Sequence, residues 1–464
     1  MYYIGHPSYY RKHIEHVCFQ HSGILKKRNY QKNQKKYIMK LNESAMKNAE
    51  KKSNSYLAIR MTRSGYNYFK GICVCTFLLS TILYLGIAVI MSHLCVFDDT
   101  AMLYLRQNRS RLAESNIFRT LFISWIRWDA IYFVDMAVNG SLFEQEWAFS
   151  SLWPKIISFL AFRSKDVVLL GIVSCFASIF FHAIACYALY LLTKSIFSNQ
   201  KMTAYTVIFY CFSPSGIYMS VGYTESLFAA FSFLGLLLFI KKQQYPAAFL
   251  WSLATLIRSN GIFWCIFFGM PAIGTLKISL ERLQLTFMQV SQLVGYGTKC
   301  LIILVPFFYN QYLGFKLFCP GVAWCNKSLP LIYPAVQEKY WNVGFLRYWT
   351  LNNIPNFLFA LLSIIPILFA LFYSISGSTL HSFRSIKSHL VLSALYLYIG
   401  CFHMHTQVLN RMSSALPLLY WSMAHATLYA KSRNLKAFGH CILFVWIVYT
   451  VIQAGLYGSF LPPA

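Results

Sequence analysis

The chain has 464 residues, of which 57% are hydrophobic, 18% aromatic and only 12% charged, a balance that excludes an ordinary soluble globular protein and indicates several membrane spans. Its net charge of +27 does not by itself indicate nucleic-acid binding, because 15 of the 41 basic residues lie at or before Lys70 and many others lie in short loops. We therefore expect a lipid bilayer as the surroundings and no nucleic-acid partner.

The first segment, residues 1–70, is polar and basic, with runs such as Lys26-Lys27-Arg28 and no sustained apolar face. This pattern is typical of a disordered cytosolic leader, with binding to anionic lipid headgroups as the alternative. No apolar stretch follows the first basic residues and no cleavage site of small residues is visible, so we expect no signal peptide. The first membrane span then directs the chain to its membrane.

Ten apolar runs follow the leader. Seven are read as membrane spans, at 71–96, 166–192, 294–313, 355–375, 390–404, 407–429 and 438–457. Three shorter ones lie at 203–220, 225–240 and 246–273, in a region that "SPSG", "GYTES", "KKQQYP" and "RSNG" interrupt. Broken helices predict half-spanning elements around a cavity, because irregular backbone is tolerated in a bilayer only where it is shielded. We predict an all-α polytopic membrane protein with about eleven segments within 71–457 and a short tail at 458–464.

The distribution of basic residues orients these segments. With a cytosolic N-terminus, the positive-inside rule is met by turns that carry Lys194 and Lys201, Lys241 and Lys242, Lys277 and Arg282, Arg384 and Lys387, and Lys431, Arg433 and Lys436. The two longest loops, 97–165 and 314–354, then face the lumen. Asparagines in glycosylation sequons lie on that side, at Asn108, Asn139 and Asn326.

Most cysteines lie inside hydrophobic runs, where a small apolar role is the usual one: Cys175, Cys186, Cys211 and Cys265. Cys319 and Cys325 differ, because they flank a Pro-Gly turn in the second long loop and can form a disulfide if that loop is lumenal.

The stretch "SWIRWDAIYFVDMAVNG", residues 124–140, places an acid in the first long loop. Phe133 and Ala137 follow Asp129 at helical spacing, which predicts a short interfacial helix with its aromatic residues at headgroup level. A carboxylate held there can act as a general base on a sugar hydroxyl. The alternative is an exposed acid that caps the helix.

Four blocks of sequence, in order, resemble the GPI mannosyltransferase 2 (PIG-V) family. They are "RWDAIYFVDMAVNGSLFEQEWAF", "FSPSGIYMSVGYTESLFAAFSFLG", "RSNG", and "YWNVGFLRYWTLNNIPNFLFALLSI" with "HTQVLNRMSSALPLLYWSMAH". They span most of 125–430. The chain departs from the family pattern at "SSLWP", where many members have Phe-Phe-Pro, and the leader takes no part in the resemblance.

The resemblance implies a GT-C-type glycosyltransferase of the endoplasmic reticulum, with its active site in the lumen. Such an enzyme transfers the second mannose of the GPI anchor, in an α-1,6 link, from dolichyl-phosphate-mannose to the one-mannose lipid intermediate. Fungal members are associated with a small membrane protein, so a partner subunit is implied as well. No cofactor or metal is expected, because the departing phosphate is a stable anion and no cluster of acids has metal-ligating spacing.

This reaction needs one base and a set of cations. The leaving phosphate requires no general acid, whereas the attacking 6-hydroxyl benefits from a base, for which we predict Asp129, with inversion by in-line attack. Cations that stabilise the phosphate are expected among Arg258, His403, His405 and Arg411.

The family motifs add further substrate-binding candidates: Trp128, Glu144 and Glu225. Glu225 also fits an acid at a helix start, and Arg127 fits an interfacial anchor. Aromatic residues of the second long loop fit either sugar stacking or interfacial anchoring: Trp324, Tyr340, Trp341, Tyr348 and Trp349.

Two rival functions remain open at this point. One keeps the polyprenyl-phosphate-sugar chemistry with a different acceptor. The other is a lipid transporter or flippase, since broken helices at the membrane midplane also mark those folds. A transporter is expected to place its ionisable residues inside the membrane, whereas Asp129 and Glu144 fall in a loop, so Asp129→Asn separates the two classes.

Overall fold

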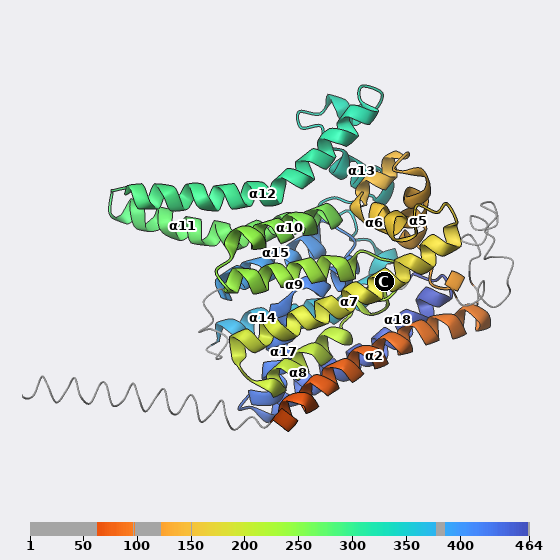
Figure 1. Ribbon diagram of the computed structural model, residues 1–464, viewed down its shortest axis with the longest axis horizontal. Helices are drawn as coiled ribbons and strands as arrows, with labels where there is room; N and C mark the ends of the chain where they lie inside the picture. The colour runs from red at the N-terminus through yellow and green to blue at the C-terminus, as the bar shows by residue number, and fades with distance from the viewer. Residues whose placement is uncertain (1–62, 96, 98–121, 150, 377–385, 463–464) are drawn as a thin grey trace, which may run out of the picture. The chain divides into compact units, whose positions relative to one another are not determined.

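The computed structural model describes residues 63–95, 97, 122–149, 151–376 and 386–462 (Figure 1). The chain divides into two compact units, Met1–Tyr68 and Phe69–Ala464. The predicted leader and the sequon at Asn108 lie almost entirely outside the described residues.

The described residues contain eleven α-helices of 12 residues or more and no strand, which confirms the all-α fold. These helices are α2 (Arg63–Leu94), α7 (Val167–Phe197), α8 (Gln200–Cys211), α9 (Glu225–Ile240), α10 (Gln244–Ile257), α11 (Ile266–Glu281), α12 (Phe287–Phe318), α14 (Ile354–Ile375), α15 (Ile386–Phe402), α17 (Pro417–Tyr429) and α18 (Arg433–Gly458). Shorter helices connect them: α5 (Asp129–Asn139), α6 (Leu152–Leu160), α13 (Ile332–Trp341) and α16 (Val408–Met412).

Six helical segments in this part of the chain are long and apolar enough to cross a membrane. They are Tyr68–Leu94, Val167–Phe197, Ser259–Glu281, Phe287–Phe318, Leu351–Ile375 and Arg433–Gly458. Two shorter apolar helices, α9 and α15, accompany them. The polytopic membrane character predicted from composition is therefore confirmed.

Local sequence explains where several helices begin. Asp166 caps α7 by accepting hydrogen bonds from the N–H groups of Val168 and Leu169. Thr286 and Gln289 form a capping box, so α12 begins at Phe287, several residues before the predicted span at 294–313.

The break predicted at "RSNG" is confirmed, and one predicted continuous run is wrong. The run 246–273 is divided at Arg258, which has extended backbone between α10 and the 3-10 helix η4 (Ser259–Cys265). The run 407–429 is divided into α16, a 3-10 turn and α17, because a residue before proline avoids helical backbone and Pro417 begins α17.

The helices of the second unit pack in a continuous series. α7 contacts α8 and α9, α10 lies between α9 and α12, and α17 contacts α8 and α18 (Figure 1). At Gly235 a β-carbon would lie 2.3 Å from the Trp251 indole nitrogen, so α9 and α10 approach closely only because this residue is glycine. Helices α5, α6 and α13 gather at one end of this series (Figure 1).

Candidate active site

A cavity of about 350 Å³ lies where the start of α5, the loop before α9, the end of α10, α13 and α16 meet. Its charged and polar lining comes from segments far apart in the chain. The lining includes Trp128, Asp129, Tyr218, Tyr223, Arg258, Asn260, Gln337, Trp341, His405, Gln407 and Arg411. Among the predicted site residues, Trp128, Asp129, Arg258, His405 and Arg411 are therefore brought together.

Four charged side chains form a continuous network at this cavity. Arg411 donates to Asp129 Oδ2 at 2.8 Å and, through Nε, to Glu225 Oε1 at 2.5 Å. Arg258 donates to the same Glu225 oxygen at 2.5 Å and to the Thr224 hydroxyl at 3.3 Å. Two guanidinium groups thus share one carboxylate, and one of them also holds Asp129.

Burial distinguishes the two carboxylates of this network. The Glu225 side chain is 0% exposed, whereas that of Asp129 is 24% exposed. Glu225 lies behind the cavity wall and serves as a counter-charge, since buried cations need compensation. Asp129 is the carboxylate that a substrate in the cavity can reach.

The backbone at Trp128 is strained. Its φ of 52° lies in the left-handed region, which is unusual for a large side chain and costs about 1–3 kcal/mol. The indole ring stacks on Phe460, with ring centroids 5.0 Å apart. This turn leads directly into α5, so it determines the direction in which the Asp129 side chain points from the backbone.

Two tyrosines hold this turn in place. The Tyr223 hydroxyl accepts a hydrogen bond from the Asp129 N–H at 3.1 Å and donates to the Arg127 carbonyl at 3.3 Å. The Tyr457 hydroxyl donates to the carbonyls of Trp125 and Arg127. Both tyrosine side chains are buried. The strain is therefore maintained by contacts from α18 and from the loop before α9.

Glu144 lies outside the cavity and joins the two long loops. It accepts hydrogen bonds from Trp324 at 2.7 Å, Lys339 at 2.5 Å and Tyr340 at 2.9 Å. Burial raises the pKa of Glu144, but these hydrogen bonds outweigh burial and the net pKa is lowered. The structure does not bring Glu144 to the other predicted site residues.

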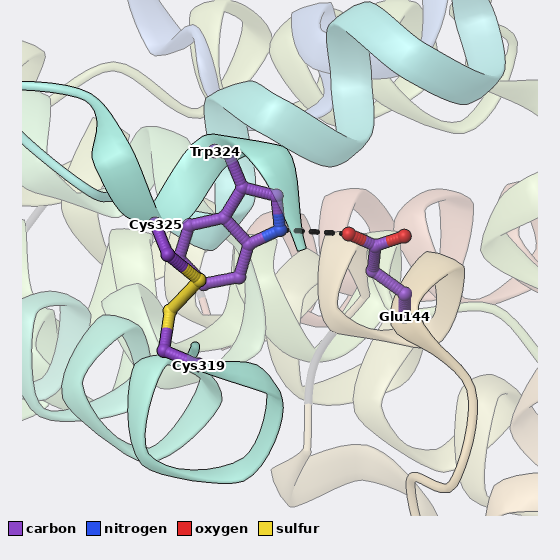
Figure 2. The surroundings of a disulfide bond; sticks show 4 residues. All are labelled: Glu144, Cys319, Trp324 and Cys325. Atoms are coloured by element: carbon purple, nitrogen blue, oxygen red, sulfur yellow. Dashed lines mark hydrogen bonds between the residues drawn. A yellow bond between two sulfur atoms is a disulfide. The ribbon is translucent and has the colours of Figure 1, made fainter. Parts of the chain in front are cut away.

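A disulfide closes a short turn of the second long loop next to this contact. Cys319 and Cys325, whose pairing the sequence left open, are bonded, and Figure 2 shows the pair beside Trp324 and Glu144. The Glu144 contact anchors α13, whose Trp341 and Gln337 form part of the cavity wall. Glu144 therefore acts on the cavity through the position of α13.

The remaining aromatic and histidine candidates divide between the cavity and its surroundings. His405 lines the cavity, bonds to the Trp341 carbonyl oxygen at 2.7 Å and stacks on Tyr348 with centroids 4.3 Å apart. His403 lies away from the lining and contacts Tyr398. Trp349 is exposed.

Sequence reasoning missed the tyrosines of the cavity. Tyr218 and Tyr223 present their rings to the Arg411 guanidinium at 4.9 and 5.0 Å. Both lie in the same motif block as Glu225, and their spacing of five residues gave no sign that they meet α16. The wall also contains Asn260, which donates to the Tyr396 hydroxyl at 2.9 Å.

Comparison with known proteins gives consistent matches. The sequence profile of a family described as mannosyltransferase (PIG-V) matches residues 69–464. GPI mannosyltransferase 2 of Yarrowia lipolytica is 37% identical over 343 residues, which cover 73% of this chain and 87% of the relative. The Candida albicans protein of the same name is 31% identical over 402 residues, covering 82% of this chain and 96% of the relative.

The crystal structure of the Archaeoglobus fulgidus oligosaccharyltransferase aligns with 83% of this chain and 53% of its own, at 14% identity and a TM-score of 0.41.

Proposed function

This chain belongs to the PIG-V family of mannosyltransferases, and we propose that it transfers the second mannose of the GPI anchor from dolichyl-phosphate-mannose to the one-mannose lipid intermediate. It is a glycosyltransferase of GPI-anchor synthesis and a multi-pass membrane protein of the endoplasmic reticulum. Its family membership sets the transporter alternative aside. A different acceptor remains the rival to this proposal.

Asp129 is the general base in this mechanism. It is the accessible carboxylate of the charged network, and Arg411 holds Oδ2, which leaves Oδ1 without a hydrogen bond among the described residues. A hydroxyl of the acceptor sugar within hydrogen-bond reach of Oδ1 can give up its proton as the new glycosidic bond forms. Attack from the face opposite the phosphate inverts the anomeric carbon and yields the α-1,6 link.

Arg258 is the cation best placed for the departing phosphate. Its hydrogen bonds to described residues use one guanidinium nitrogen, so the other two can donate to phosphate oxygens. Arg411 is committed to two carboxylates and serves mainly to position Asp129. In a partly buried cavity, donors aimed at developing negative charge stabilise the transition state.

We place the cavity on the lumenal side and the N-terminus in the cytosol. Asn139 ends α5 and Asn326 lies in the second long loop, and both sequon asparagines are exposed near the segments that build the cavity. Glycans at either position would mark that face as lumenal.

Rescue of depleted cells tests the proposal. Cells lacking the protein should accumulate a one-mannose GPI intermediate, which is detected by radiolabelling. Expression of the wild-type protein should remove this accumulation, whereas expression of Asp129→Asn should not. Asp135→Asn on the same helix is the matched control and should rescue. If no one-mannose species accumulates, the acceptor is wrong; if Asp129→Asn rescues at normal abundance, the base is wrong.

A further inference from the structure

A second cluster of reactive side chains lies in the helical core, away from the cavity. His182 and Cys186 are one turn apart on α7, and Cys211 is the last residue of α8. Their imidazole and thiol ligand atoms all lie within 4.8 Å of one another, and all three residues are buried. None of them lines the cavity of the candidate active site.

His182 has unused hydrogen-bonding capacity. The imidazole faces the Cys211 thiol, and neither ring nitrogen bonds to an oxygen or nitrogen atom among the described residues, although the side chain is 0% exposed. Its ring is held edge-on by Phe77 at 5.1 Å and Tyr210 at 5.6 Å. Buried polar groups in a membrane-spanning helix are costly unless satisfied, so an imidazole that faces two thiols and bonds to no oxygen or nitrogen is suited to hold a metal ion.

We propose that His182, Cys186 and Cys211 bind a zinc ion. Two sulfur ligands at about 2.3 Å from zinc, at the tetrahedral angle, lie about 3.8 Å apart. The observed Cys186 Sγ to Cys211 Sγ separation is 3.7 Å. The sulfur pair therefore already has the spacing of a zinc site, and binding draws the imidazole nitrogen inward by about 1 Å.

The donor set selects the class of metal. Two thiolates and an imidazole suit zinc and disfavour magnesium, calcium and manganese, which prefer oxygen ligands. Zinc binding displaces one proton from each thiol, and Zn²⁺ with two thiolates and a neutral histidine has no net charge. A neutral site is favoured over a charged one in a low-dielectric core, which argues for Zn²⁺ over Cu⁺. The buried Ser80 hydroxyl, which donates to the Phe77 carbonyl at 3.0 Å, also interacts with Cys211 and offers an oxygen as the fourth ligand.

The zinc has a structural role, because the site is closed to the cavity. α8 has only 12 residues and its end is held to α2 by the Tyr84 hydroxyl, which donates to the Cys211 carbonyl at 2.7 Å. A metal bound by α7 and α8 fastens this short helix a second time.

Metal analysis of the full-length protein tests the site. The protein is purified in detergent without chelators, and zinc is measured by plasma mass spectrometry, with about one ion per chain expected. Cys186→Ser and Cys211→Ser should each lose the zinc. Cys175→Ser removes another buried thiol of α7 outside the cluster and should retain it.

A readout on the wild type avoids dependence on variant folding. Protein from cells grown with cobalt should show the thiolate-to-cobalt charge-transfer band and the visible bands of tetrahedral coordination. Wild type with neither zinc nor these bands would overturn the proposal. So would full zinc retention in both variants, or peptide mapping that finds Cys186 and Cys211 joined as a disulfide.

Discussion

Replacing the shared counter-charge by Glu225→Gln should strongly destabilise the protein. Glu225 is fully buried and accepts hydrogen bonds from Arg258 and Arg411 at 2.5 Å each. Removing one partner of a buried ion pair costs about 3–5 kcal/mol, because the other charge stays buried without compensation. In the variant, Arg258 keeps its hydrogen bond to Thr224 and Arg411 keeps its ion pair with Asp129. We therefore expect the free energy of unfolding to fall by about 3 kcal/mol, the lower end of that range.

Glu338→Gln is the matched control for this prediction. Glu338 also bridges two cations, Lys327 at 3.1 Å and Arg347 at 3.0 Å, but its side chain is 44% exposed. Exposed pairs contribute little, because water screens them. Thermal and denaturant unfolding of the purified proteins should show a large loss for Glu225→Gln and none for Glu338→Gln. Equal effects of the two changes would refute the reasoning from burial.

Three further outcomes are expected. Tyr223→Phe removes two neutral hydrogen bonds at the turn before Asp129. The kcat for mannose transfer should therefore fall about tenfold while KM stays unchanged. A change in KM alone would contradict a positioning role for Tyr223. The pKa of Glu144 is lowered below 4.5 in the folded protein, so its contribution to stability is present above that pH and lost as pH falls through the folded value. Acid unfolding of Glu144→Gln should lack this part of the wild-type pH dependence, and an unchanged profile would count against the contact with Lys339. Mannose transfer should survive brief exposure to EDTA, since the donor phosphate leaves as a stable anion; loss of activity restored by Mn²⁺ or Mg²⁺ would contradict this.

The membrane character and several local features could be predicted from the sequence. The apolar composition predicts membrane-spanning helices, because inside a bilayer every backbone N–H and C=O group must find its hydrogen-bond partner within the protein. The helix that begins at Asp129 was also predicted, since it depends on residues close together in the chain. For the same reason the sequence offered Cys319 and Cys325 as a possible pair, and the structure shows them bonded. The role of Asp129 as the base stays a prediction until its variant is assayed.

The charged network was decided by the tertiary structure. Asp129 and Arg411 are 282 residues apart, and Glu225 and Arg411 are 186 apart, so no spacing rule could pair them. Motif matches proposed Glu144 for the same site, and only the folded loops show it engaged with Lys339 and Trp324 instead.

The same limit explains why the sequence did not show the break before α17 or the buried cluster. Hydropathy reports burial and not direction, so the apolar run 407–429 gave no sign of the break between α16 and α17. His182 and Cys186 share a helix face at a visible spacing of four, but Cys211 reaches them from α8 through helix packing. Periodicity along a chain determines which face of a helix is buried, whereas the neighbour that it meets depends on how the helices cross, and only the tertiary structure decides that.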